Sequence, residues 1–339
     1  MLNRLVSAAL EQVSRRKGGG IIVNEHTLNR EQTRRHVDAL SRSFEFIALD
    51  DLPERLAKGA QKPFCLLTFD DGKRSNALAT APELSRLGVP ALFLLVSEFL
   101  DRGTPLWFDR YHQLWKHLGR YPSGLSPTAV KQLPYALLVE RVERECQRHG
   151  VDPDVTADDV APMTWEQARE LKKLGFGIGS HGTTHAIMTR ETWFDASRNI
   201  AKGISDITAQ LGEPCTSFAF PNGNYTAGLA KHAVSCGARF VMTTEPTWMD
   251  ATVPLWRIPR IQLFGSQTES RMLLKVATSA IGSVLLNPDG TRRAYVAIDR
   301  LAKSTMDRGV DPIPMNSRAP TTATEQTSTE RLRRPIQGA

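Results

Sequence analysis

The chain has 339 residues, 41% of them hydrophobic and 7% aromatic, so it is long enough to bury the core of a barrel-sized domain. Its net charge of +7 suits an anionic partner, but the basic residues are dispersed and not interleaved with aromatics, which argues against nucleic acid. The longest apolar run, residues 91–96, is far shorter than the ~20 residues of a membrane-spanning helix.

The first predicted element is an amphipathic helix over residues 1–19. Apolar side chains recur at helical spacing from Leu2 to Val13, and a basic run at residues 15–17 follows. The helix either covers the bottom of a barrel, which we favour, or makes a peripheral membrane contact. Glu11 interrupts the apolar patch and no small-residue cleavage site follows, so the expected location is cytoplasmic, with membrane association as a variant.

Short apolar runs then alternate with amphipathic helices, which is the pattern of parallel strands joined by helical crossovers. The predicted strands are residues 20–24, 44–49, 65–69, 91–96, 176–180, 217–220, 240–243 and 257–263. The predicted helices between them include residues 30–43, 76–87, 164–174, 190–211 and 226–236. Eight strands indicate an α/β barrel, which we place at residues 20–308.

Two segments depart from this alternation. Residues 101–162 are predicted to form a mainly helical insertion over one rim of the barrel. Trp107, Tyr111 and Trp115 lie four residues apart in it, so they share a helix face that either packs within the insertion, which we favour, or stacks on sugar rings. Residues 309–339 are rich in proline, threonine and charge, with little to bury, and are predicted to be a disordered tail.

Two motifs carry the predicted chemistry. Thr68-Phe69-Asp70-Asp71-Gly72 ends a buried strand with two carboxylates, at the sheet edge where α/β proteins hold their chemistry. His181 and His185 follow another predicted strand, and their spacing puts both on one side of a first helical turn. With Asp71 they form a ligand set that leaves open positions on a divalent ion. These residues predict metal-assisted hydrolysis, with Asp70 taking a proton from the attacking water.

On these motifs the chain resembles the polysaccharide deacetylase family, carbohydrate esterase family 4 with its nodulation-type deacetylase homology domain. Residues 68–72 reproduce the first family motif and residues 181–185 the second, within a match from about residue 20 to 271. The resemblance implies a distorted, incomplete (β/α) barrel. It also implies that N-acetyl groups are removed from amino sugars of a surface polysaccharide or its precursor.

The resemblance further implies roles for individual residues. Asp70 would be the general base, and Asp71, His181 and His185 would bind one divalent ion. Zinc is the expected ion, although this donor set also suits cobalt, nickel or iron. The expected partner is an N-acetylated oligo- or polysaccharide.

The third family motif is altered in this chain. Residues 219–223 read Ala-Phe-Pro-Asn-Gly where the family usually has Arg-x-Pro-Tyr-Gly, so the arginine that orients the base is replaced. Pro221 and Asn222 remain the expected oxyanion segment, because a backbone N–H survives a change of side chain. By resemblance to surface-polysaccharide members, Arg260 is expected to replace the arginine, with Arg257 as the alternative. If Arg260 does not have this role, it is expected to be a solvent-facing cation on an edge strand.

The late histidine that supplies the general acid in the family is also absent, because no histidine follows His232. His26, just past the first predicted strand, resembles the Tyr-His of exopolysaccharide-type members and is the candidate for protonating the leaving group. These departures keep two other functions open. One is a non-catalytic glycan-binding protein of the same fold, and the other is a hydrolase of a different non-peptide C–N bond.

Overall fold

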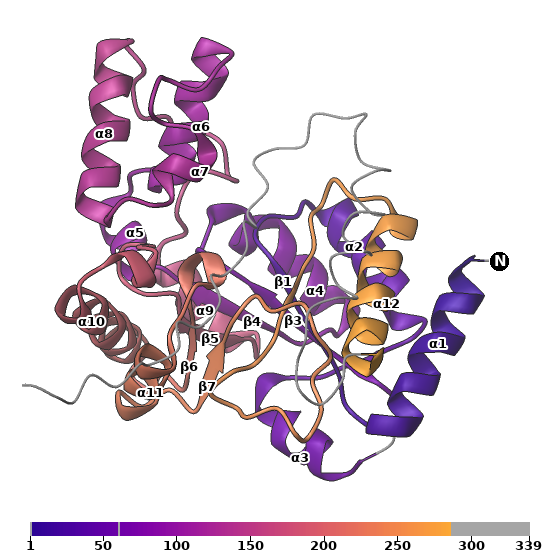
Figure 1. The fold of residues 1–339 in the computed structure, drawn as a ribbon. Helices are drawn as coiled ribbons and strands as arrows, with labels where there is room; N and C mark the ends of the chain where they lie inside the picture. Colours follow the sequence, from indigo (N-terminus) through magenta and orange to yellow (C-terminus); the bar gives the residue numbers. More distant parts are fainter. Residues whose placement is uncertain (1, 60–61, 286–339) are drawn as a thin grey trace, which may run out of the picture.

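The computed structural model describes residues 2–59 and 62–285, with a curled parallel sheet at its centre (Figure 1). The strands are Gly20–Glu25 (β1), Glu45–Phe46 (β2), Phe64–Phe69 (β3), Ala91–Leu95 (β4), Gly177–Ser180 (β5), Ser217–Ala219 (β6), Phe240–Met242 (β7) and Ile261–Gln262 (β8). Their order is β7-β6-β5-β4-β3-β1-β8, and β2 pairs with β3 beside this path. The predicted distorted (β/α) barrel is confirmed.

The seam of the barrel lies between β7 and β8. The segment before β8 hydrogen-bonds to β7, with Ile258 N donating to Val241 O at 2.8 Å. The prediction of one continuous strand over residues 257–263 is wrong. Pro259 lies within that segment, and because proline has no N–H it cannot donate to a strand ladder. This break places Arg260 at the seam, where its side chain is fully buried.

Helices follow most strands at the predicted places, in the order α2 (Arg30–Ser41), α4 (Ala81–Leu87), α9 (Trp165–Lys173), α10 (Trp193–Leu211) and α11 (Ala227–Ser235). The helix predicted over residues 76–87 begins as a π-helical segment, η2 (Asn76–Thr80). A capping box starts α2, because Asn29 Oδ1 accepts from Gln32 N and Gln32 Oε1 accepts from Asn29 N. Two helices were not predicted, α3 (Leu52–Ala57) and α12 (Glu269–Leu285).

The N-terminal helix α1 (Leu2–Lys17) packs against α12, and the two run side by side in Figure 1. Its buried residues Leu10 and Val13 join the same apolar cluster as Met272 and Val276 of α12. The described end of its apolar face is therefore covered by protein. In the described part of the chain, no helix has the length and apolar character needed to cross a bilayer.

The segment between β4 and α9 holds α5 (Ser97–Arg102), α6 (Trp107–Leu118), α7 (Pro127–Val130) and α8 (Tyr135–Arg148). Helices α6, α7 and α8 form a group of their own above the barrel (Figure 1). They share an apolar cluster of Trp107, Tyr111, Leu114, Leu125, Val130, Leu138, Val142 and Cys146. The Trp107 and Tyr111 side chains thus pack within the insertion. The predicted tail, residues 309–339, lies outside the described residues.

Candidate active site and metal centre

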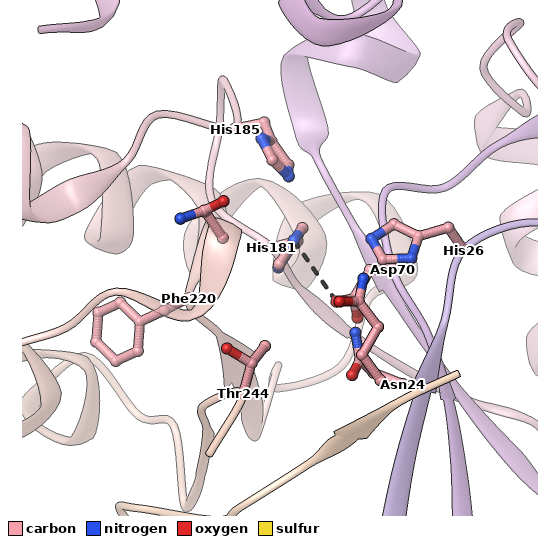
Figure 2. A pocket seen from close by; sticks show the side chains of 9 residues that line it. Asn24, His26, Asp70, His181, His185, Phe220 and Thr244 are labelled. Atoms are coloured by element: carbon pink, nitrogen blue, oxygen red, sulfur yellow. Dashed lines mark ion pairs between the residues drawn. The ribbon is translucent and has the colours of Figure 1, made fainter. Parts of the chain in front are cut away.

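The residues predicted to carry chemistry meet at the carboxyl edge of the sheet. Asp70 and Asp71 follow β3, and the two histidines follow β5. One ligand atom each of Asp71, His181 and His185 lies within 4.8 Å of the others, and all three side chains are buried. Figure 2 shows both histidines, Asp70 and His26 around one pocket. Segments far apart in the sequence therefore supply a single site.

A tight turn after β3 separates the two adjacent carboxylates. Asp71 has a left-handed φ of 77° and Gly72 one of 85°, and Gly72 N donates to Asp70 O at 3.1 Å. The Asp70 carboxylate consequently faces Arg260, while Asp71 Oδ1 lies 3.4 Å from His185 Nε2. A non-glycine residue with this φ is uncommon and costs about 1 kcal/mol or more, so it marks Asp71 as a constrained position.

The two histidines lie on an irregular loop, and the prediction that they occupy the first turn of a helix is wrong. Helix α10 begins only at Trp193. Gly182 and His185 have left-handed φ values of 77° and 58°, which cannot continue a right-handed helix. The Gly182 carbonyl instead accepts from Ser97 N, at the start of α5, at 3.2 Å. Neighbouring loops thus hold the histidines in place.

The donor set fits a divalent cation. His181 Nδ1–H donates to Ala219 O at 2.9 Å, which leaves Nε2 available to bind a metal. Burial lowers the pKa of His181 to about 4 and that of His185 to about 3, so both imidazoles are neutral at pH 7, as metal ligands must be. Among the residues that the structure describes, neither Asp71 oxygen nor His185 Nδ1 has a hydrogen-bond partner, and all three atoms are buried. A carboxylate buried in this way is costly unless a cation neutralises it.

Asp70 forms a buried, bidentate ion pair with Arg260. The Nη1–Oδ1 and Nη2–Oδ2 distances are 2.6 and 2.9 Å, and Arg260 also donates to Thr243 O and Thr68 Oγ1, both at 3.0 Å. Burial by itself would raise the pKa of the Asp70 carboxyl, but the charge and hydrogen bonds of the Arg260 guanidinium hold the pKa well below its usual range. Asp70 is therefore ionised and fixed in orientation.

The alternative arginine lies elsewhere. Arg257 pairs with Glu245, with Nε 3.0 Å from Oε2, and both side chains are about half exposed. The structure thus places Arg260, and not Arg257, beside Asp70. The reading of Arg260 as a solvent-facing cation is wrong, because its side chain is fully buried.

The altered third motif borders the same pocket. Asn222 has a left-handed φ of 57° and lines the pocket, whereas Pro221 is buried and is not among the lining residues. Lys131 Nζ, from the insertion, donates to Asn222 Oδ1 at 3.0 Å. A Cβ on Gly223 would lie only 1.8 Å from Thr244 Oγ1, so this position of the turn requires glycine.

Several residues of the site were not predicted. The pocket is also lined by four residues at or beside strand ends, Asn24, Phe220, Thr244 and Gln262. Their positions at the ends of β1, β6, β7 and β8 were a usable signal, since ligands bind at the carboxyl ends of parallel strands. Asn199 of α10 supports the histidine loop by accepting from Thr183 N at 2.9 Å. Neither Asn199 nor Lys131 stands in a recognisable motif.

Comparisons with known proteins place the chain by family and by fold. The family model described as polysaccharide deacetylase matches residues 57–241. A search of curated proteins found no match.

Similar solved structures share the fold at low sequence identity. A Streptococcus pyogenes deacetylase, PplD, in complex with acetate has a TM-score of 0.54 at 13% identity, covering 76% of this chain and 97% of its own. IcaB from Ammonifex degensii has a TM-score of 0.51 at 16% identity, covering 78% and 98%. A de-N-acetylase from Aggregatibacter actinomycetemcomitans has a TM-score of 0.50 at 14% identity, covering 74% and 96%.

Removing Arg260 should be far more costly than removing Arg257. Arg260→Met would leave the buried Asp70 carboxylate unpaired, and we expect it to lower the free energy of unfolding by about 3–5 kcal/mol. The matched variant Arg257→Met breaks only a half-exposed pair and should cost about 0–1 kcal/mol. Urea denaturation of the metal-free proteins measures both changes. Equal losses in the two variants would contradict the assigned pairing.

The metal-free protein should lose stability as the pH falls from about 6.5 to about 4.5. In that window the unfolded chain protonates His181 and His185, whose folded pKa values are about 4 and about 3, so the unfolded state binds more protons. The free energy of unfolding should fall by up to ~1.4 kcal/mol per pH unit for each histidine. Asp70, whose folded pKa is lowered, adds to the loss only below its unfolded pKa of ~3.9.

Urea denaturation at several pH values in the presence of a chelator measures this slope. The control is the double variant His181→Gln and His185→Gln, which should show a flatter dependence. Parallel slopes in the two proteins would show that the histidines are not the source of the effect.

Proposed function

Since the chain belongs to the polysaccharide deacetylase family, we propose that it is a metal-dependent hydrolase that removes N-acetyl groups from amino sugars of a surface polysaccharide or its precursor. One observation favours this function over the two alternatives, a non-catalytic glycan-binding protein and a hydrolase of another C–N bond. The buried Asp71, His181 and His185 group lies beside an ionised carboxylate, Asp70, held by Arg260. A ligand set with open positions next to a fixed base is what metal-assisted hydrolysis requires.

Asp71, His181 and His185 would hold the ion, with zinc as the expected metal. When bound, a divalent ion in such a site supplies a Lewis acid that polarises the acetyl carbonyl and acidifies water. The chain's own contribution is the geometry of the donors. His181 is oriented by Ala219 O, and neither Asp71 oxygen has a hydrogen bond from residues 2–59 or 62–285.

Asp70 is the proposed general base. Its Oδ2 lies 3.8 Å from His181 Nε2, so a water beside the ligand atoms is within reach of the carboxylate. Arg260 donates one hydrogen bond to each carboxylate oxygen of Asp70. Each oxygen has a further lone pair that can accept a proton. As the water oxygen bonds to the acetyl carbon, its proton passes to Asp70.

Two further groups complete the proposed reaction. The backbone N–H of Asn222 would donate to the oxygen of the acetyl group as it becomes negative. His26 lines the pocket close to Asp70 (Figure 2) and would give a proton to the nitrogen as the C–N bond breaks. The products are acetate and the free amine of the sugar.

Exchanging aspartate for asparagine at adjacent positions separates the two carboxylate roles. Asp70→Asn should retain about one divalent ion per chain but lower acetate release from N-acetylated oligosaccharides by roughly 10²–10⁴-fold, because the base is lost. Asp71→Asn should lose the ion, because a ligand is lost. Metal content measured by mass spectrometry and an acetate assay test both variants.

The same assay distinguishes the other functions. A wild-type chain that binds metal but releases no acetate from any glycan would favour the hydrolase of another C–N bond or the non-catalytic glycan-binding protein. A wild-type chain that binds no divalent ion would eliminate the proposed mechanism.

The role of His26 can be tested with two leaving groups. A sugar amine must be protonated to depart, whereas the phenolate of an aryl acetate leaves without a proton. His26→Gln should therefore lower the turnover of an N-acetylated oligosaccharide by roughly 10²-fold or more and change that of an aryl acetate much less. His232→Gln, outside the pocket, is the control. Equal losses on both substrates in His26→Gln would rule out leaving-group protonation.

A further inference from the structure

We propose that the first turn of α6 in the helical insertion, Trp107-Phe108-Asp109, positions the metal centre by holding the loops of two ligands, Asp71 and His185. These three residues are positioning residues, since they contact the ligand loops and not the ion. The inference rests on the proposed function, because it concerns the ion that this function needs.

The two histidine ligands are supported differently. His181 is fixed by the hydrogen bond from its Nδ1–H to Ala219 O. His185 Nδ1 is buried and has no hydrogen-bond partner in the described part of the chain. A metal-binding histidine almost always uses its second ring nitrogen to fix the ring orientation. The orientation of His185 must therefore come from other contacts.

Trp107 and Phe108 supply those contacts. Trp107 Nε1 donates to the backbone carbonyl of His185 at 3.2 Å, and the indole is almost fully buried. The Phe108 ring packs edge-on against the imidazole, with centroids 4.8 Å apart and an interplanar angle of 63°. The indole hydrogen bond is made to a residue whose φ of 58° is unfavourable for a residue with a side chain. Trp107 thus holds the backbone of His185, and Phe108 orients its imidazole ring.

Asp109 attaches the same helical turn to the other ligand loop. Its carboxylate pairs with the ammonium of Lys73, which lies two residues after Asp71, and the Lys73 side chain is only 2% exposed. The ammonium also lies over the rings of Phe99 and Phe108, at 4.9 and 5.0 Å from their centroids. The first turn of α6 therefore contacts both the loop of Asp71 and the loop of His185. It fixes the distance between Asp71 and His185, on which a shared ion depends.

The test is the affinity for cobalt, measured by titrating the metal-free protein of residues 1–339 with Co²⁺ and following the visible absorption of the bound ion. Trp107→Phe keeps an aromatic ring but removes the N–H donor together with part of the buried indole. We expect the Kd for Co²⁺ to rise by roughly 10–100-fold, which is the usual effect of removing a residue that orients a metal ligand. Trp115→Phe is the control on the same helix, because Trp115 stacks on His112 and lies tilted against Tyr121, away from the ligand loops.

Urea denaturation of the metal-free variants separates positioning from general stability. The proposal is supported if Trp107→Phe weakens Co²⁺ binding although urea denaturation shows that it is fully folded without urea, and if Trp115→Phe binds Co²⁺ as the wild type does. It is overturned if Trp107→Phe binds Co²⁺ as tightly as the wild type. Should Trp107→Phe not fold, Phe108→Leu decides by the same Kd, with weakened binding as support and unchanged binding as refutation. A wild-type chain that binds no Co²⁺ would instead remove the proposed function itself.

Discussion

The site is organised by the burial of two adjacent carboxylates at the end of one strand. Asp70 is neutralised within the protein by the bidentate guanidinium of Arg260. Asp71 has no lysine or arginine partner in the described part of the chain, and the two histidines beside it are kept neutral by burial. Because an isolated buried carboxylate is strongly unfavourable, this asymmetry calls for an external cation beside Asp71. The ionised carboxylate that we propose as the base and the carboxylate that we propose as a metal ligand are thus separated by one turn of the backbone.

Much of this arrangement was predictable because it is encoded locally. Alternating apolar runs and helices determine a parallel barrel, and polar residues at the ends of its strands must meet at one edge. Arg260 was a harder case, since the third motif had lost its arginine. The structure shows how an arginine far along the chain comes to pair with Asp70. Pro259 interrupts strand pairing at the seam and leaves the next side chain inside the barrel, within reach of Asp70.

The features of the site that could not be predicted depend on long-range contacts and on backbone strain. Three residues other than glycine have a left-handed φ, namely Asp71, His185 and Asn222, among the residues that the structure describes. All three lie at the site, and no local sequence pattern predicts their left-handed conformation. The sequence pattern suggested a helix for the histidines, but neighbouring loops impose an irregular path. Likewise, nothing in Trp107-Phe108-Asp109 identifies partners almost 80 residues away at His185, because that contact exists only after folding.

The most direct test of the central claim is anomalous diffraction from crystals of the full chain grown with cobalt, recorded on both sides of the cobalt absorption edge. The account predicts one strong anomalous peak within about 2.0–2.3 Å of a carboxylate oxygen of Asp71 and of a ring nitrogen in each of His181 and His185. A fully bound ion at some other position, or no peak at this one, would contradict it.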